Sequence, residues 1–361
     1  MAYEIDNLPL EDLMLPISKA TVALTRLDER LGRSPVGAGM VQRLHMQDAI
    51  ASMWLDGELV HLEDLVLHDA LMDSRTPSHA LTLAHVVLRM RRQIAGRRAN
   101  WAMSATGLKQ LLGLDPTMPV AGEPEPSVSN DDGTDQLPVS DPLLDDIDAL
   151  LARTDALLTG KAAIRKTEPA RDSLIYEDDW DEDGRLQEWR ACFDATDHLP
   201  PLLRAAIMHD AWFSMEVVQR SPWIGRLLTA AFLREAGIGI NHLPTISLGL
   251  RNKRPDERRS PNRIVRLRTF FAAIEEAAEA GMKENDRLML AREQMQRKLK
   301  NRRSNSRLPQ LMDMILRNPL ISTQMVEKEL QVTGPGALKL ISELNVREIT
   351  GRGRFRAWGI L

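Results

Sequence analysis

Residues 199–237 read LPPLLRAAIMHDAWFSMEVVQRSPWIGRLLTAAFLREAG, and the rest of the chain is organised around this stretch. Apolar residues recur at spacings of three and four in its first half, which predicts a helix with one apolar face. Pro200-Pro201 suits the first turn of that helix, because proline there removes no hydrogen bond from the ladder. Ser221-Pro222 interrupts the pattern, which resumes at Ile224 and continues until Gly237 ends it. The stretch therefore predicts two helices around a short central loop.

The second of these helices begins with Gly225-Arg226-Leu227-Leu228. A helix–loop–helix with this start resembles the core of the Fic adenylyltransferase family, in which the loop reads His-Pro-Phe-x-Asp-Gly-Asn-Gly-Arg. The resemblance implies a histidine that deprotonates the target hydroxyl and an acid that holds magnesium. It also implies glycines that, together with the helix N-terminus, bind nucleotide phosphates.

The loop of this chain departs from that pattern at each chemical position. An ungapped count from Gly225 places Met215 at the histidine, Gln219 at the acid and Arg220-Ser221-Pro222 at Gly-Asn-Gly. A gap of one residue places Glu216 at the histidine instead. Neither alignment supplies an imidazole, and no glycine remains to let backbone amides close on a phosphate. We therefore expect a Fic-like scaffold with no catalytic residue, no metal and no cofactor.

Residues 8–72 are predicted to form three helices, of which the first is amphipathic and ends near Gly32. Within them, residues 43–57 read RLHMQDAIASMWLDG. This segment resembles the N-terminal region of Fic proteins, whose Ser-x-x-x-Glu-Gly element is autoinhibitory and pairs its glutamate with the second arginine of the catalytic motif. Ser52, Asp56 and Gly57 stand at those places, and Arg226 matches the arginine. The resemblance implies a structural Asp56–Arg226 pair that ties the N-terminal helices to the core.

The composition indicates a helical intracellular protein with an uneven distribution of charge. The 361 residues include one cysteine, so an internal disulfide and a cysteine-rich zinc site are excluded. The first residues do not form a basic segment followed by an apolar run, and 18 apolar residues in a row do not occur, so we expect neither secretion nor a membrane span. We therefore expect a cytoplasmic location. The net charge of −4 divides into −15 for residues 1–250 and +11 for residues 251–361. A basic C-terminal third favours nucleic acid as a partner, although the two halves could instead neutralise each other in the folded protein or an oligomer.

Two acidic or polar segments interrupt the first part of the chain. Residues 114–140 are rich in Pro, Gly, Ser, Asp and Glu, which predicts a disordered linker, and a further helix is expected from Asp141-Pro142 to Gly160. Residues 176–184 read YEDDWDEDG and resemble a calcium loop, but the twelfth position holds Arg190 in place of the glutamate. We interpret Glu177–Asp183 as a solvated acidic loop that could dock a basic partner.

Residues 251–307 form a basic connector. Its pattern predicts two helices, over residues 261–280 and 282–303, that are separated at Gly281. Many of its arginines suit an ordinary charged surface helix. Lys298, Arg302 and Arg303 cluster immediately before the last domain, where a basic segment adds phosphate contacts to a DNA-binding module.

The last 54 residues, 308–361, predict a winged helix-turn-helix. Helices are expected over residues 308–317, 323–330 and 334–345, with Ser322 capping the second and a turn at residues 331–333. Residues 346–350 and 354–360, joined by Gly351-Arg352-Gly353, predict a β-hairpin. This Thr-Gly-Arg-x-Arg-x-Arg wing resembles the C-terminal DNA-binding domain that is appended to many Fic proteins.

In such a domain the third helix lies in the major groove, and the wing reaches phosphates or the minor groove. The expected wing contacts are Arg352, Arg354 and Arg356. Gly334-Pro335-Gly336-Ala337 at the start of the third helix offers almost no side chain for reading bases, which leaves Lys339, Ser342 and Glu343 as polar positions. Of these we expect Lys339 and Ser342 to contact DNA. The sequence therefore favours DNA binding of modest specificity over a module that binds protein.

Together these observations predict a mainly α fold, with a Fic-like helical body and a C-terminal winged helix-turn-helix that carries a small β-hairpin. The expected divisions are 1–113, the N-terminal helical region; 114–140, the linker; 141–250, the degenerate core; 251–307, the basic connector; and 308–361, the DNA-binding domain. The overall arrangement is similar to proteins of rhizobia and related bacteria that pair a Fic-derived region with a helix-turn-helix.

We interpret the chain as a non-enzymatic DNA-binding transcriptional regulator, whose inactive scaffold mediates dimerisation or senses a partner. The alternative is a divergent nucleotide-dependent adenylyltransferase or phosphotransferase that uses Glu216 or His209 as its base. Nucleotide binding would distinguish the two, because only the enzyme requires it.

Overall fold

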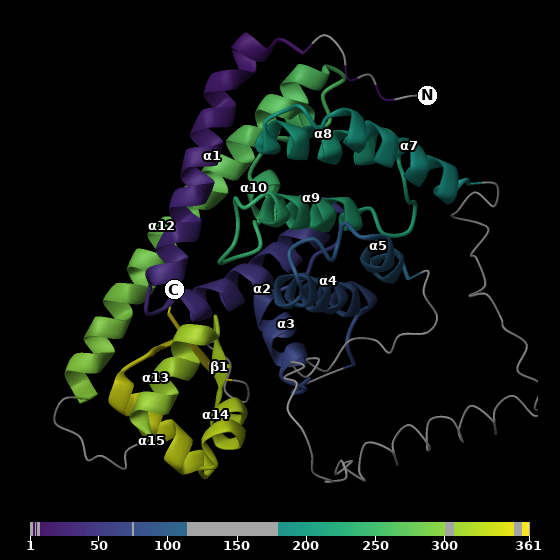
Figure 1. Ribbon diagram of the computed structural model, residues 1–361. Helices are drawn as coiled ribbons and strands as arrows, with labels where there is room; N and C mark the ends of the chain where they lie inside the picture. The colour runs from purple at the N-terminus through teal and green to yellow at the C-terminus, as the bar shows by residue number, and fades with distance from the viewer. Residues whose placement is uncertain are drawn as a thin grey trace, which may run out of the picture. The chain divides into compact units, whose positions relative to one another are not determined.

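A computed structural model describes residues 3, 5, 8–73, 76–113, 180–299, 307–349 and 356–360 of the protein. This part of the chain is mainly helical, with one small sheet near the C-terminus (Figure 1). Among the described helices, none is long and apolar enough to cross a membrane. The predicted linker at residues 114–140, the helix expected at residues 141–160 and the acidic residues 177–179 lie outside the described residues.

The three helices expected within residues 8–72 are confirmed, and they are followed by two more. The bounds of these five helices are α1 Leu10–Arg33, α2 Gly37–Leu55, α3 Leu62–Asp69, α4 His79–Gly96 and α5 Ala105–Leu111. Ser78 caps α4 by accepting a hydrogen bond from the backbone N–H of Leu81 at 3.2 Å. Helix α2 ends where Gly57 adopts a positive φ of 92°, a conformation that glycine adopts without steric cost.

The two helices predicted from residues 199–237 are also confirmed, as α8 Pro201–Ser214 and α9 Trp223–Glu235. Their close packing explains Gly225, because a Cβ atom there would lie 2.3 Å from the Trp212 side chain. Trp212 in turn packs edge-on against Trp189 of α7, Glu182–Ala195, with ring centroids 5.1 Å apart. The sequence did not predict α7, and its first turn contains Glu182 and Asp183, which we had expected in a loop.

Two short helices, α10 Ile246–Arg251 and α11 Pro255–Arg258, lead into the long helix α12, Arg263–Leu299. The prediction that Gly281 separates two helices was wrong, since α12 continues through it for 37 residues. Gly281 is buried against α1, and a Cβ atom there would approach the Leu27 side chain to 2.9 Å. The glycine therefore allows α1 and α12 to pack closely along each other (Figure 1).

Buried ion pairs join the helices of the body. Arg91 of α4 contacts Asp48 of α2 at 2.5 Å, and the other Asp48 oxygen accepts the backbone N–H of Leu248 at 2.8 Å. Asp28 of α1 accepts a 2.7 Å hydrogen bond from the His242 side chain. The described helices before residue 113 and after residue 182 also share one apolar core. The division of the chain into the domains expected from the sequence stays a prediction.

The C-terminal segment has the predicted helices α13 Leu308–Arg317, α14 Thr323–Leu330 and α15 Gly334–Leu344. A short strand that we did not predict, β1 Ile321–Ser322, precedes α14, and β2 Arg347–Glu348 and β3 Ala357–Gly359 follow α15. All pairings are antiparallel, in the order β1-β3-β2, with Trp358 opposite both Ile321 and Glu348. The extra strand extends the predicted hairpin to a three-stranded sheet.

A buried arginine joins this segment to the helical body. Arg43 of α2 donates hydrogen bonds to the carbonyl oxygens of Leu316, Ile315 and Asn318 at 3.0, 2.8 and 2.7 Å. These carbonyls lie at the C-terminus of α13, where no further helical N–H is available to them. Gly39 allows the approach, because a Cβ atom there would lie 2.8 Å from the Leu316 oxygen.

Candidate functional site

The exposed face of α15 carries both residues that we predicted on it. Lys339 is exposed, and the Ser342 hydroxyl, also exposed, donates to the Lys339 carbonyl at 2.7 Å. Leu338, with 39% of its surface exposed, lies beside them. Lys339 is thus available for a phosphate or a base, whereas the Ser342 hydroxyl already has a backbone acceptor within its own helix.

The predicted wing is described only at its base. Arg356 is exposed and forms a bidentate ion pair with Glu348 across the hairpin, with nitrogen–oxygen distances of 3.0 and 2.6 Å. Its guanidinium carbon also lies 5.1 Å from the centroid of the Trp358 ring. The hydrogen bonds with Glu348 raise the pKa of Arg356 and lower that of Glu348. A phosphate contact by Arg356 would therefore compete with Glu348; Arg352 and Arg354 lie outside the described residues.

Of the predicted connector contacts, only Lys298 is described, and it has an internal partner. Its ammonium group donates to the carbonyl oxygen of Leu344 at 2.7 Å. This carbonyl is at the C-terminus of α15, where a cation is favoured by the helix dipole. Lys298 therefore connects α12 to the predicted recognition helix, a role that the basic run around it did not indicate. Arg302 and Arg303 lie outside the described residues.

The helical body contains a cavity of about 840 Å³ beside the central helix pair. Its lining comes from the end of α2, from α8 and α9, from α11 and from the start of α12. Asp56 and Arg226, predicted as a pair, both line it and are in contact at 2.5 Å. Arg226 also donates to the side-chain and backbone oxygens of Ser52, at 2.9 and 3.1 Å, so two of the three positions of the N-terminal pattern, Ser52 and Asp56, meet at one guanidinium.

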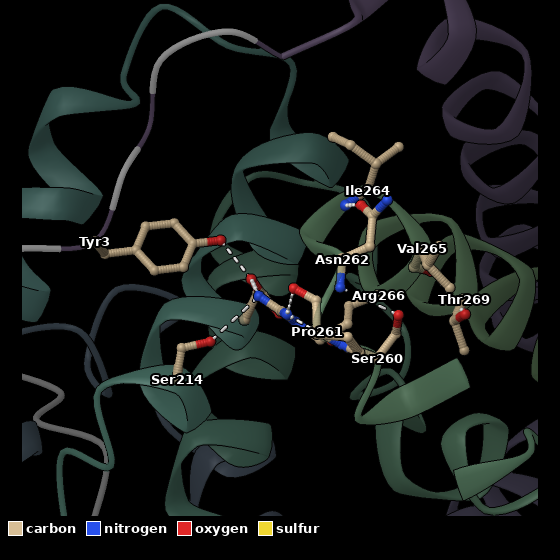
Figure 2. A network of polar contacts seen from close by, with 10 residues as sticks. Tyr3, Ser214, Ser260, Pro261, Asn262, Ile264, Val265, Arg266 and Thr269 are labelled. Carbon is tan, nitrogen blue, oxygen red and sulfur yellow. Dashed lines mark hydrogen bonds and ion pairs between the residues drawn. The ribbon is translucent and has the colours of Figure 1, made fainter. Parts of the chain in front are cut away.

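A second arginine in the lining of the cavity, Arg266, is also paired with a carboxylate. Arg266 of α12 contacts both oxygens of Asp210, at 2.6 and 2.8 Å, and donates to the Ser260 carbonyl at 2.7 Å. The Tyr3 hydroxyl donates to the same carboxylate at 2.5 Å, and Figure 2 shows the side chains of Tyr3 and Ser214 pointing toward this ion pair. Burial and the Asp210 charge raise the pKa of Tyr3, and the hydrogen bonds to Asp210 raise that of Arg266. Both carboxylate oxygens of Asp210 therefore have hydrogen-bond partners.

His209 and Glu216, the bases of the enzymatic alternative, both line this cavity. Burial lowers the pKa of His209 to about 3, so the imidazole is neutral at physiological pH. Its buried Nε2 atom has no hydrogen-bond partner in the described part of the chain. Glu216 is exposed and has a left-handed φ of 47°, directly after the end of α8. The two residues share one space with Arg226, which the sequence did not establish.

The cationic side of the cavity is formed by Arg258 and Arg259, which the sequence did not single out as site residues. Arg258 donates to the Lys253 carbonyl at 3.1 Å and lies over the Trp54 ring at 5.5 Å, and among the described residues no carboxylate pairs with either arginine. The basic run at residues 251–259 was their only sequence signal. No group of three or more potential metal-ligating side chains exists within the described ranges.

The C-terminal segment is a winged helix-turn-helix. Its elements follow in the order α13, β1, α14, α15, β2 and β3, and its sheet has the strand order β1-β3-β2. Residues 308–361 match a family model described as "HTH DNA binding domain", so this segment is a DNA-binding domain. Residues 174–300 match a second model, described as "Protein of unknown function (DUF1612)". A protein from Sinorhizobium fredii, described as "Uncharacterized protein y4cF", is 45% identical over 380 residues, with 100% of both chains covered. The chain belongs to the same family as this Sinorhizobium protein.

Proposed function

We propose that the protein is a non-enzymatic transcriptional regulator that acts in the cytoplasm. The observation that carries this proposal is the helix-turn-helix DNA-binding domain at residues 308–361. Its recognition helix leaves Lys339 exposed, and its junction with the body is basic. Because the start of α15 offers few side chains to the bases, we expect contacts to phosphates to dominate the affinity.

We further propose that the body is a Fic-derived scaffold that has lost its catalytic function and serves dimerisation or the sensing of a partner. The contact between Asp56 and Arg226 supports this origin, because it joins the two segments that carry the resemblance. The residues at the positions of the catalytic loop support the loss of activity, since Met215 and Gln219 can neither accept a proton nor hold magnesium as the family's residues do. The acidic run Glu177–Asp183 is a candidate segment for docking a basic partner.

The test is binding of the full chain to duplex DNA by fluorescence anisotropy over a salt series, with fragments that include its own promoter. We expect salt-sensitive binding with preference for one fragment. Changing Arg352 and Arg354 together to Ala should weaken binding and reduce the salt slope by up to about 0.9 per lost phosphate contact. The matched control is Lys19→Ala with Arg26→Ala, which removes two exposed charges from α1. Absence of binding at low salt, or equal effects of both double variants, would refute the proposed role of the wing.

The enzymatic alternative keeps one supporting observation, which is that His209, Glu216 and Arg226 line the same cavity. A nucleotide-dependent transferase would bind ATP with Mg²⁺ and modify itself or a partner. Incubation with radiolabelled ATP and Mg²⁺ tests this directly, with Glu216→Gln as the variant that removes the candidate base. Labelling that disappears in Glu216→Gln would favour the transferase over the regulator.

A further inference from the structure

The body cavity has a cationic wall whose charge the surrounding protein does not neutralise. Arg258 and Arg259 line it, and no carboxylate in the described part of the chain pairs with them. The pKa of Arg258 is lowered by burial and by the neighbouring charges of Arg259 and Arg226. Like charges held together at a cavity wall repel each other, and an anion placed between them would relieve that repulsion.

The acids of the cavity are already occupied. Asp56 is paired with Arg226, and Asp210 is paired with Arg266 and accepts the hydroxyl of Tyr3. Glu216 is the lining acid that has no partner among the described residues, and it is exposed. Apart from the Glu216 carboxylate, the cavity therefore presents its unpaired charge as guanidinium groups, which bind carboxylates and phosphates through planar pairs of hydrogen bonds.

The remaining wall is aromatic. Trp54 lies beneath the guanidinium of Arg258, and Phe213 and Phe270 have ring centroids 4.8 and 5.1 Å from that of His209. The Nε2 atom of His209 is buried and has no hydrogen-bond partner in the described part of the chain. Flat apolar surfaces suit a ring-bearing ligand.

We propose that this cavity binds a small organic anion, in which a flat ring packs among Trp54, Phe213 and Phe270 and an acidic group is bound by Arg258 and Arg259. The volume of about 840 Å³ lies within the range of small-molecule sites. Such a ligand is an effector if the protein is the regulator proposed above, but its binding does not depend on that function. The ligand class differs from a metal-bound nucleoside triphosphate in that the ligand carries no metal ion.

The experiment is isothermal titration calorimetry of the full chain with four probes. Phenyl phosphate and benzoate carry a ring and an acidic group, benzyl alcohol carries the ring alone, and inorganic phosphate carries the charge alone. We expect one of the two aromatic anions to bind at least about tenfold more tightly than both single-feature probes, since each lost feature removes a set of contacts. The comparison of phenyl phosphate with benzoate distinguishes a phosphate ester from a carboxylate.

Arg258→Gln and Arg259→Gln should each weaken binding of the preferred anion roughly tenfold, because a charge-assisted contact is lost. Arg254→Gln is the matched control, since Arg254 is exposed, pairs with Asp256 and does not line the cavity. Equal affinity of all three variants, or equal affinity for benzyl alcohol and the anions, would overturn the proposal. A fifth titration uses ATP with Mg²⁺, and tighter binding of this probe than of either aromatic anion would also overturn the proposal and favour a nucleotide site. The titration contains no DNA, so failure of the DNA-binding proposal would leave its result intact.

Discussion

At the scale of single residues, His209 is a buried histidine whose protonation opposes folding. Burial accounts for most of the lowering of its pKa to about 3, and Arg226 adds to it, while Asp210 acts in the opposite sense. In the unfolded chain a histidine titrates near pH 6.5. Between these two values the unfolded state binds a proton that the folded state does not, so stability falls as the pH is lowered from about 6.5 toward 3.

We therefore expect His209→Gln to reduce the acid sensitivity of folding. Lowering the pH to 5 should cost the native protein about 2 kcal/mol through this residue alone, and the variant should lose that much less. Urea unfolding at pH 7.5 and pH 5 measures the difference. His45, whose pKa is also lowered by burial, contributes in the same direction to both proteins. The exposed His79→Gln serves as the control, and an identical pH response of the His209 variant and the native protein would contradict the argument.

Single charged residues also show the limit of reading function from sequence. Lys298 and Arg356 were predicted to contact DNA because they lie in basic runs. In the structure Lys298 donates to the Leu344 carbonyl, and Arg356 pairs with Glu348. Glu348 is 8 residues earlier in the chain than Arg356, and the two face each other because the hairpin folds back. A sequence shows where charge is located, but it does not show which partner is already beside it.

At the scale of elements, the close contact between α8 and α9 depends on Gly225. A Cβ atom at this position would lie 2.3 Å from the side chain of Trp212, which is buried and packs against Trp189. The indole cannot move away without disturbing that packing. Gly225→Ala should therefore destabilise the protein by roughly 1–3 kcal/mol, despite the higher helix propensity of alanine.

The control is Gly96→Ala at the C-terminal end of α4, where an added Cβ atom meets no other atom within 4 Å. That change should be neutral or stabilise by up to about 1 kcal/mol. Urea midpoints of the two variants give the comparison. If both alanines have the same effect, the tight packing at Gly225 is not what the glycine provides.

Gly281 also allows two helices to pack closely, although its position in the sequence suggested a break between helices. A glycine within a helical pattern costs helix stability, so it was interpreted as the end of one helix and the start of another. In the structure α12 continues through it, and the missing side chain accommodates Leu27 of α1. The outcome was set by a partner about 250 residues earlier in the chain, which no local pattern reveals.

At the scale of the whole molecule, α12 connects the cavity to the DNA-binding domain. Arg266 near its start binds Asp210 at the cavity wall, and Lys298 near its end binds the C-terminus of α15. A helix of 37 residues is about 55 Å long. Together with Arg43, it makes the position of the recognition helix depend on the packing of the body.

Arg43 should therefore be needed to hold the DNA-binding domain against the body. Burial lowers its pKa to about 10, so it remains charged at neutral pH while donating to three carbonyls of α13. Arg43→Met should cost roughly 3 kcal/mol or more, because those carbonyls lose charged donors. Hydrogen exchange should show the amides of residues 308–349 opening before those of the body.

The matched control is Arg30→Met, which removes an exposed ion pair between α1 and Asp286 of α12. Such a pair contributes at most about 1 kcal/mol, so its loss should leave the exchange pattern unchanged. Uniform loss of protection throughout the chain in Arg43→Met would mean that the domain and the body unfold as one unit, contrary to the expectation.

The sequence by itself determined the local elements of this protein. The bounds of α13 and α14, the Ser322 cap and the helix pair around Ser221-Pro222 follow from capping residues, proline and apolar spacing, all of which act within a few residues. The contact of Asp56 with Arg226 was expected from a resemblance, not from spacing. Only the tertiary structure decided that α12 is continuous, that Lys298 and Arg43 bind helix termini, and that unpaired arginines share a cavity with His209. These features depend on side chains from distant segments meeting in space, and that meeting is a property of packing that sequence periodicity does not contain.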